Sequence, residues 1–171
     1  LANKILSHFN DIIVTTNDPS IIKSIKNDYG ETSNIRIRVR PEKLSDDFAT
    51  MKDTVSDVLT HFSDIPENEK IIVLYPTYPE REINDILSAK NFLELGNFRS
   101  MLCAKKIITH PYKCLKFHDG HHGRPIFEHE LYRRQDYPDC FEVSHFIVMF
   151  LKSEIVNLNN QMYNDNTGYM K

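Results

Sequence analysis

The chain has 171 residues, of which 40% are hydrophobic and 26% are charged, and its formal net charge is −3 with histidine neutral. These values are typical of a globular domain, and so small a net charge gives no field that would recruit nucleic acid or a membrane surface. No apolar run is long enough to span a bilayer, and the N-terminal residues lack the basic start and cleavage site of a secretory signal. With three widely spaced cysteines and no Cys-x-x-Cys pair, we expect a cytoplasmic domain with reduced thiols.

Strand and helix patterns alternate through the first hundred residues. Short β-branched runs predict strands, and capping residues or glycines mark the helix ends. The clearest helix begins at Thr50, because Asp53 completes a capping box and the apolar residues that follow keep helical spacing. The predicted strands are 11–16, 34–40, 70–75 and 100–108, and the predicted helices begin at Pro19, Thr50 and Glu82, the last ending at Leu95.

The second half is less regular and richer in strand patterns. His118-Asp119-Gly120 is typical of a hairpin turn. A metal site is the alternative for this segment, which also holds His121 and His122, but it lacks the helical spacing that places two ligands on one face. The remaining predictions are strands at 113–117, 124–127 and 146–150, a short helix at 153–158 and a polar loop at 159–166.

The order of these elements predicts the fold class. Alternating strands and helices favour an α/β fold with a mostly parallel, doubly wound sheet, here with a β-rich hairpin extension in the second half. Because no linker or repeat interrupts the chain, we expect a single domain over residues 1–171. Ligands of such sheets bind beyond the carboxyl ends of the strands, which points to the loops 15–18, 40–50 and 75–81.

The loop that starts with Arg40 and Pro41 is the first candidate for binding chemistry. A guanidinium at a strand end can bind a base carbonyl or a phosphate with fixed geometry. The alternative is that Arg36, Arg38 and Arg40 form one solvated face of an exposed strand, since alternating charge is commonly a sign of exposure.

The loop after residues 70–75 is held by two prolines, Pro76 and Pro79. Its rigid backbone would leave Tyr75, Thr77 and the N-terminus of the next helix facing one cleft, and a helix N-terminus favours anions such as phosphate or a sugar carboxylate. The alternative is a rigid connection that binds no ligand.

Four segments occur in an order that resembles a known family. They are Arg-Pro-x-x-Leu-Ser-x-Asp from Arg40, Tyr-Pro-Thr-x-Pro-x-Arg from Tyr75, Thr109-His110-Pro111-Tyr112-Lys113, and Arg133-Arg134-Gln135-Asp136-Tyr137-Pro138. In this order they resemble the acylneuraminate cytidylyltransferase family over most of the chain. The resemblance implies the central portion of a nucleotide-diphospho-sugar transferase-like domain, in which CTP activates a sialic-acid-like 2-keto sugar acid and pyrophosphate is released.

The resemblance also implies roles for individual residues. Lys113 and Arg134 suit the sugar carboxylate, because Arg binds a carboxylate bidentately and Lys acts as a point charge, although by charge pattern alone both are surface cations. Mg²⁺ would be the cofactor, and the assembly would be a homodimer with residues 109–140 as the dimerisation extension. The implied sets are Arg40, Ser45, Asp47, Thr50 and Thr77 for the nucleotide, Tyr75, Lys113, Arg134, Gln135 and Ser144 for the sugar, and Arg81, Lys113 and Arg134 for catalysis.

Several features depart from the family pattern. A glycine-rich phosphate loop and an Asp-x-Asp metal element have no counterpart in this sequence, so we expect the full-length protein to be the enzyme and this stretch alone to be inactive. Tyr75 stands where the family has Gln, and Val143-Ser144-His145-Phe146 stands where it has Pro-Asn-Gly-Ala. Two alternatives therefore remain: a non-catalytic module of the same fold that serves as a dimerising scaffold or sensor, and a related nucleotidyltransferase with another base or sugar.

Overall fold

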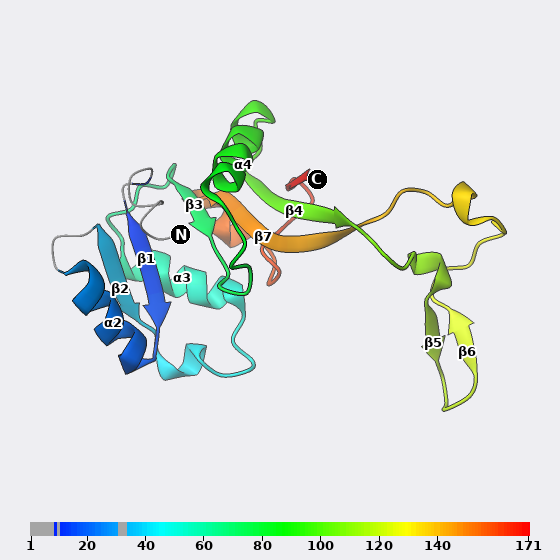
Figure 1. The fold of residues 1–171 in the computed structure, drawn as a ribbon, viewed down its shortest axis with the longest axis horizontal. Coiled ribbons are helices and arrows are strands. Elements are labelled where there is room, and N and C mark those ends of the chain that lie inside the picture. Colours follow the sequence, from blue (N-terminus) through cyan, green and yellow to red (C-terminus); the bar gives the residue numbers. More distant parts are fainter. Residues whose placement is uncertain (1–8, 10, 31–33) are drawn as a thin grey trace.

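The computed structural model describes residue 9 and residues 11–30 and 34–171, and it shows a mixed α/β body from which a long arm projects (Figure 1). The strands are β1 (Ile12–Thr16), β2 (Ile35–Val39), β3 (Lys70–Val73), β4 (Ser100–Lys106), β5 (Leu115–Phe117), β6 (Gly123–Pro125), β7 (Phe141–Leu151) and β8 (Gly168–Met170). The α-helices are α2 (Pro19–Tyr29), α3 (Met51–His61) and α4 (Ile83–Leu95). Short 3-10 helices are η1 (Glu42–Leu44), η2 (Pro111–Lys113), η3 (Arg134–Asp136) and η4 (Lys152–Asn157).

The predicted helix ends are confirmed by their capping contacts. The Asp18 carboxylate accepts from the backbone N–H of Ser20 at 2.7 Å at the start of α2, and Gly30 ends that helix with a φ of 64°. A residue with a side chain would be strained at this φ, which explains the glycine. Thr50 and Asp53 form the expected reciprocal capping box of α3.

The central sheet has the strand order β3-β7-β4-β8 and is mixed rather than mostly parallel. β7 runs antiparallel to both β3 and β4, whereas β4 and β8 are parallel; β1 and β2 form a separate parallel pair within the described residues. The α/β class is confirmed, and the difference in strand direction has a simple cause. The chain leaves the body through β4 and comes back through β7. Two strands that are connected in this way run in opposite directions, so they form an antiparallel pair.

Helices cover both faces of the central sheet, and each face has its own apolar cluster. On the α4 face, α4 packs on side chains from β4 and β7; the buried members are Ile86, Ala89, Leu93, Met101, Cys103, Ile147 and Met149. On the α3 face the buried members are Val55, Leu59, Ile65, Leu102, Val148, Phe150, Leu158 and Met162. β1 contributes Ile12 to the α4 face and Ile13 to the α3 face, so the β1–β2 pair packs against the same core.

A β-bulge interrupts the pairing of β4 with β7. Leu102 pairs with Val148 but Cys103 pairs with Ser144, so residues 145–147 of β7 have no partner on β4. Bulges are common beside functional sites, where they re-aim side chains and leave backbone groups free for other contacts. This bulge lies where the ribbon of β4 and β7 leaves the body.

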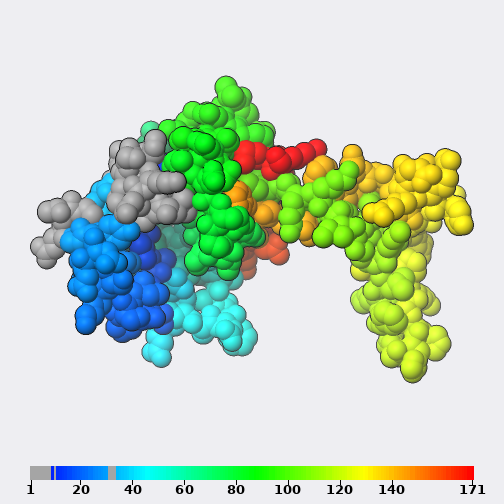
Figure 2. All heavy atoms as spheres, in the orientation of Figure 1, coloured from blue at the N-terminus to red at the C-terminus, as the bar shows by residue number. Residues whose placement is uncertain are grey.

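The arm consists of residues 107–140, between β4 and β7, and stands away from the body in Figures 1 and 2. It carries the predicted hairpin, β5 and β6, in shorter form than expected. No side chain of the arm is buried, and large apolar ones are strongly exposed, among them Ile108 at 91% and Tyr132 at 96%. Contacts among the rings of His110, Tyr112 and Tyr137 hold the base of the arm together.

The 3-10 helix η4 stands where the sequence predicts a short helix. It is followed by β8, a strand that the sequence patterns do not predict. Hydrogen bonds to the buried Glu154 carboxylate, which accepts from Arg99 at 2.7 Å and from Asn164 at 2.9 Å, fix this segment. The three cysteines are all unpaired. Within the described ranges, no helix has the length and apolar character needed to cross a membrane.

Candidate functional site

The three arginines of the second strand do not form one solvated face. Arg36 is ion-paired with Asp11 and Asp64, at 3.0 and 2.7 Å, and Arg38 with Asp57 at 2.8 Å. Arg40, by contrast, has no carboxylate partner in the part of the chain that the structure describes.

Arg40 lies at the carboxyl end of β2 and is tied to the end of β1. Its Nη2 donates to the Thr15 carbonyl at 2.9 Å, and its Nε lies 3.4 Å from the Thr15 hydroxyl. The side chain is half-buried. A partly desolvated guanidinium without a counter-ion, held by one carbonyl, is well suited to bind an anion.

The other nucleotide-binding candidates in this loop differ in how many hydrogen bonds they already make within the protein. The Thr50 hydroxyl donates to Asp53 at 2.6 Å and accepts from the Asp53 N–H at 3.1 Å, so capping α3 uses both of its functions. Ser45 donates to the Pro41 carbonyl at 3.3 Å, and Asp47 is exposed. Of these, Asp47 is the side chain most free to reach a ligand.

Arg81 is buried at 4% exposure and anchors the loop that follows β3. Its Nε donates to the Phe146 carbonyl at 2.6 Å and its Nη2 to the Tyr75 carbonyl at 3.2 Å. The Phe146 carbonyl is available because it belongs to the bulge of β7. Burial lowers the pKa of the Arg81 guanidinium. Both hydrogen bonds anchor backbone carbonyls, and the catalytic role of Arg81 stays a prediction.

Tyr75 lies half-buried at the end of this strand, next to the α3-face cluster. Its ring packs against His145 of β7, with 5.3 Å between the ring centroids. Burial raises the pKa of the Tyr75 hydroxyl to about 12, so it remains protonated near neutral pH. Thr77, two residues further on, is exposed.

Arg40 and Tyr75 belong to the same face of the molecule. Arg38 bonds to Asp57 of α3, and side chains two residues apart on a strand point to the same side, so Arg40 also points to the α3 face. Tyr75 packs against the cluster that includes α3. Both loops follow the carboxyl ends of their strands and lie toward the lower side of Figure 1.

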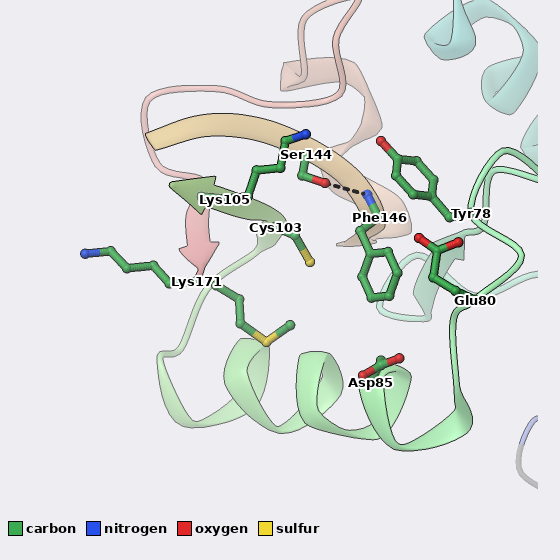
Figure 3. Close-up of a pocket in the computed structure, with 10 residues that line it drawn as sticks. Tyr78, Glu80, Asp85, Cys103, Lys105, Ser144, Phe146 and Lys171 are labelled. Carbon is green, nitrogen blue, oxygen red and sulfur yellow. Dashed lines mark hydrogen bonds between the residues drawn. The ribbon is translucent and has the colours of Figure 1, made fainter. Parts of the chain in front are cut away.

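A pocket of about 460 Å³ opens on the other face, beside the start of α4 (Figure 3). It joins the Tyr75–Arg81 loop, through Tyr78 and Glu80, to the predicted sugar-binding residue Ser144. The Ser144 hydroxyl accepts from the Phe146 N–H at 3.3 Å, and burial raises the pKa of the Cys103 thiol. The lining residues are Tyr78, Glu80, Asp85, Cys103, Ala104, Lys105, Ser144, Phe146, Met170 and Lys171. Ser144 therefore faces a different space from Tyr75.

Lys113, Arg134 and Gln135 are exposed on the arm. The two motif segments that hold them come together, because His110 is hydrogen-bonded to the Pro138 carbonyl at 3.0 Å and the rings of Tyr112 and Tyr137 are in contact. The structure does not bring them to the Arg40 or Tyr75 loops of the same chain, since the arm points away from the body (Figure 2).

The histidine segment at the tip of the hairpin forms a turn. The Asp119 carboxylate accepts from the N–H groups of His121 and His122, at 2.8 and 2.7 Å, and contacts the His122 ring at 2.8 Å. Over the described ranges, no group of three or more metal-binding side chains comes together, so no residue is assigned to Mg²⁺. Comparisons with known protein families and with characterised proteins find no match to this sequence.

Sequence reasoning missed three parts of these sites. Cys103 and Lys105 follow the two-residue alternation of a strand, which is the signal that could have placed them on one wall. Asp85 could have been found as a first-turn residue of α4. His145 lies in the segment that departs from the family pattern, but no local pattern indicates a role for it, because its partners come from distant segments.

Proposed function

We propose that the protein is a cytidylyltransferase that joins CTP to a small carboxylated, sialic-acid-like sugar and releases pyrophosphate. The observation that carries the proposal is Arg40, a guanidinium at the carboxyl end of a strand, on the face that Tyr75 also shares. Among the described residues it has no carboxylate partner. CTP and the sugar acid are proposed as substrates because four segments, in order, resemble the acylneuraminate cytidylyltransferases.

The proposed chemistry needs positioning and positive charge more than covalent steps. The sugar hydroxyl attacks the α-phosphorus in line, and cations stabilise the charge on the phosphoryl oxygens. Arg40 is suited to this task, and Arg81 keeps the Tyr75 loop in place through two carbonyls. Mg²⁺ is part of the proposal because triphosphates are commonly bound with it.

We also propose that two copies pair through their arms, so that Lys113 and Arg134 of one copy reach the sugar site of the other. A two-stranded hairpin is marginally stable by itself, and the arm exposes many apolar side chains without a core. It carries five acidic and five basic residues, so two arms need not repel each other. The oligomeric state of the full chain, measured by sedimentation across a range of concentrations, tests this part.

The activity is tested with the full-length protein, CTP, Mg²⁺ and a panel of sialic, legionaminic and pseudaminic acids. We expect pyrophosphate release with at least one acid. Arg40→Gln should lower kcat/KM by about 10- to 100-fold, as expected for a lost charged hydrogen bond of about 1.5–3 kcal/mol. Lys43→Gln removes the same charge from an exposed position of the same loop and should have little effect. No release with any acid, together with no CTP binding, contradicts the proposal.

The second candidate is a non-catalytic scaffold or sensor. It is favoured by the exposed apolar arm and by the use of Thr50 and Arg81 for structural contacts. Ligands that bind only the folded state raise its melting temperature. A comparison of CTP with UTP, GTP and ATP therefore distinguishes the scaffold from the cytidylyltransferase and from a related transferase. No shift with any nucleotide favours the scaffold, and a larger shift with another nucleotide identifies a related transferase.

A further inference from the structure

His145 is held in one tautomer by a carbonyl. Its Nε2 lies 3.1 Å from the Gln161 carbonyl oxygen, and because a carbonyl can only accept, Nε2 carries the hydrogen and Nδ1 carries the lone pair. Nδ1 has no hydrogen-bond partner in the described part of the chain, and it is not among the buried atoms that lack one. The imidazole therefore presents an open, basic nitrogen.

The turn that orients His145 is itself rigid. The Asn159 side-chain oxygen accepts from the N–H of Gln161 at 2.9 Å and from that of Tyr163 at 3.3 Å. Met162 between them is fully buried and has a φ of 68°, which costs a residue with a side chain about 1–3 kcal/mol. The buried side chain offsets this strain, so the Gln161 carbonyl is fixed toward β7.

The position of His145 on β7 is also unusual. It lies in the bulge, where residues 145–147 have no partner on β4. Its ring contacts Tyr75, which belongs to the α3 face. Ser144 and Phe146, its neighbours in sequence, line the pocket on the opposite face (Figure 3). The bulge thus directs one imidazole to the face where Arg40 lies.

Within the described residues, Tyr75 is the one titratable side chain in ring contact with His145, and no carboxylate or cation is ion-paired with it. Because burial keeps the Tyr75 pKa at about 12, that hydroxyl cannot accept a proton near neutral pH. Of this pair, His145 is the side chain with an open ring nitrogen that carries a lone pair.

We propose that His145 is the general base that takes the proton from the attacking sugar hydroxyl, an inference that rests on the proposed function. The hydroxyl oxygen forms a bond to the α-phosphorus of CTP as its proton moves to Nδ1 of His145. The bond from the α-phosphorus to the bridging oxygen breaks, and pyrophosphate leaves with that electron pair. The imidazolium then returns its proton to water. The Gln161 carbonyl orients the base, as the third group does in known nucleophile–base pairs.

The same turn offers groups that can hold a polyhydroxylated substrate. Asn159, Asn160 and Gln161 line a shallow surface depression together with Tyr163. Side-chain amides donate and accept hydrogen bonds, which matches the hydroxyl groups of a sugar. A sugar held there would lie next to the residue that orients His145.

The test uses the full-length protein and compares His145→Gln with His61→Gln. Glutamine can still donate to the Gln161 carbonyl but cannot serve as the base, so the variant preserves the contact and removes the chemistry. We expect His145→Gln to lower kcat by about 10²- to 10⁴-fold, the usual contribution of general base catalysis, with CTP affinity unchanged. The fall in rate on the acidic side of the pH profile should disappear in this variant. His61 is an exposed residue of α3, and its variant should behave as the wild type.

Rescue provides a second readout. His145→Ala should regain part of its activity when imidazole is added, whereas His145→Gln, whose side chain fills the site, should not. Wild-type turnover with an unchanged kcat and pH profile in His145→Gln overturns the role of His145 and leaves the proposed function intact. A wild type that neither binds CTP nor releases pyrophosphate overturns both.

Discussion

The same two strands are buried at one end and exposed at the other. In the body, β4 and β7 bury Met101, Leu102 and the run from Ile147 to Phe150, whereas their outer ends at Lys105, Lys106 and 141–143 are exposed. The body therefore has a core that can stabilise it alone, and the arm has none. The arm is therefore ordered by contacts other than its own burial, and four sets of variants test how far the two regions are independent.

The largest effect should come from the core of the body. Phe150 is fully buried in the α3-face cluster, and Phe150→Ala should lower the free energy of unfolding by about 3–5 kcal/mol through lost burial and a cavity. Phe117→Ala in β5, where the ring is 58% exposed, should change it by less than about 0.5 kcal/mol. Urea denaturation of both variants gives the comparison. Equal losses would show that the arm and the body unfold as one unit.

The buried cation of the body should come next. Arg81→Met removes two hydrogen bonds from a charged donor and should lower the free energy of unfolding by about 1.5–3 kcal/mol. Arg134→Met, on the exposed arm, should leave it unchanged and should lower turnover, because it removes a cation proposed to bind the sugar carboxylate. Thermal denaturation and pyrophosphate release together separate anchoring from binding. Undiminished turnover in the arm variant would remove Arg134 from the site.

A smaller effect is expected from the turn and cap residues of the two regions. Thr50→Ala removes the cap of α3 and should cost about 1 kcal/mol. Asp119→Ala opens the turn at the tip of the arm hairpin, where all contacts are local, and should not alter the stability of the body. Hydrogen exchange can follow both: protection should fall in α3 in the first variant and only around the hairpin in the second.

The smallest effect concerns the dependence of the free energy of unfolding on acidic pH. The hydrogen bond from Arg99 lowers the pKa of buried Glu154 from its ordinary value of 4.5. The stability that this carboxylate contributes is therefore fully present above about pH 4.5 and is lost as the pH falls through its lowered folded value. Glu154→Gln should be less stable near neutral pH, and its stability should decline less steeply between pH 5 and 3. An unchanged acid slope in urea titrations would assign the loss to other carboxylates.

Local signals in the sequence predicted the parts of the fold that local contacts create. Thr50 and Asp53 lie three residues apart, and the hairpin turn at Asp119 is likewise closed by its own neighbours. The direction of β7 was not predictable in this way, because the same apolar run suits a parallel or an antiparallel neighbour. β8 was missed because its three residues lack a period long enough to read.

The candidate site was predicted where a strand end marked it and missed where distant segments meet. Arg40 stands out as the last basic residue of an alternating strand, but only the structure shows that Arg36 and Arg38 are already ion-paired. His145 depends on a carbonyl sixteen residues away and on a ring seventy residues earlier. No window of the sequence holds both of those contacts.

Residues 145–147 of β7, which do not pair with β4, separate the two halves of the β4–β7 ribbon. Because they have no partner on β4, the pairing with β7 has two independent registers. One covers Ser100 to Leu102 and the other covers Cys103 to Lys106. An insertion or deletion between Lys105 and Phe141 can therefore change the reach of the arm without shifting the core pairs from Ser100 to Leu102. The length of the arm can therefore vary while the interior of the body stays constant.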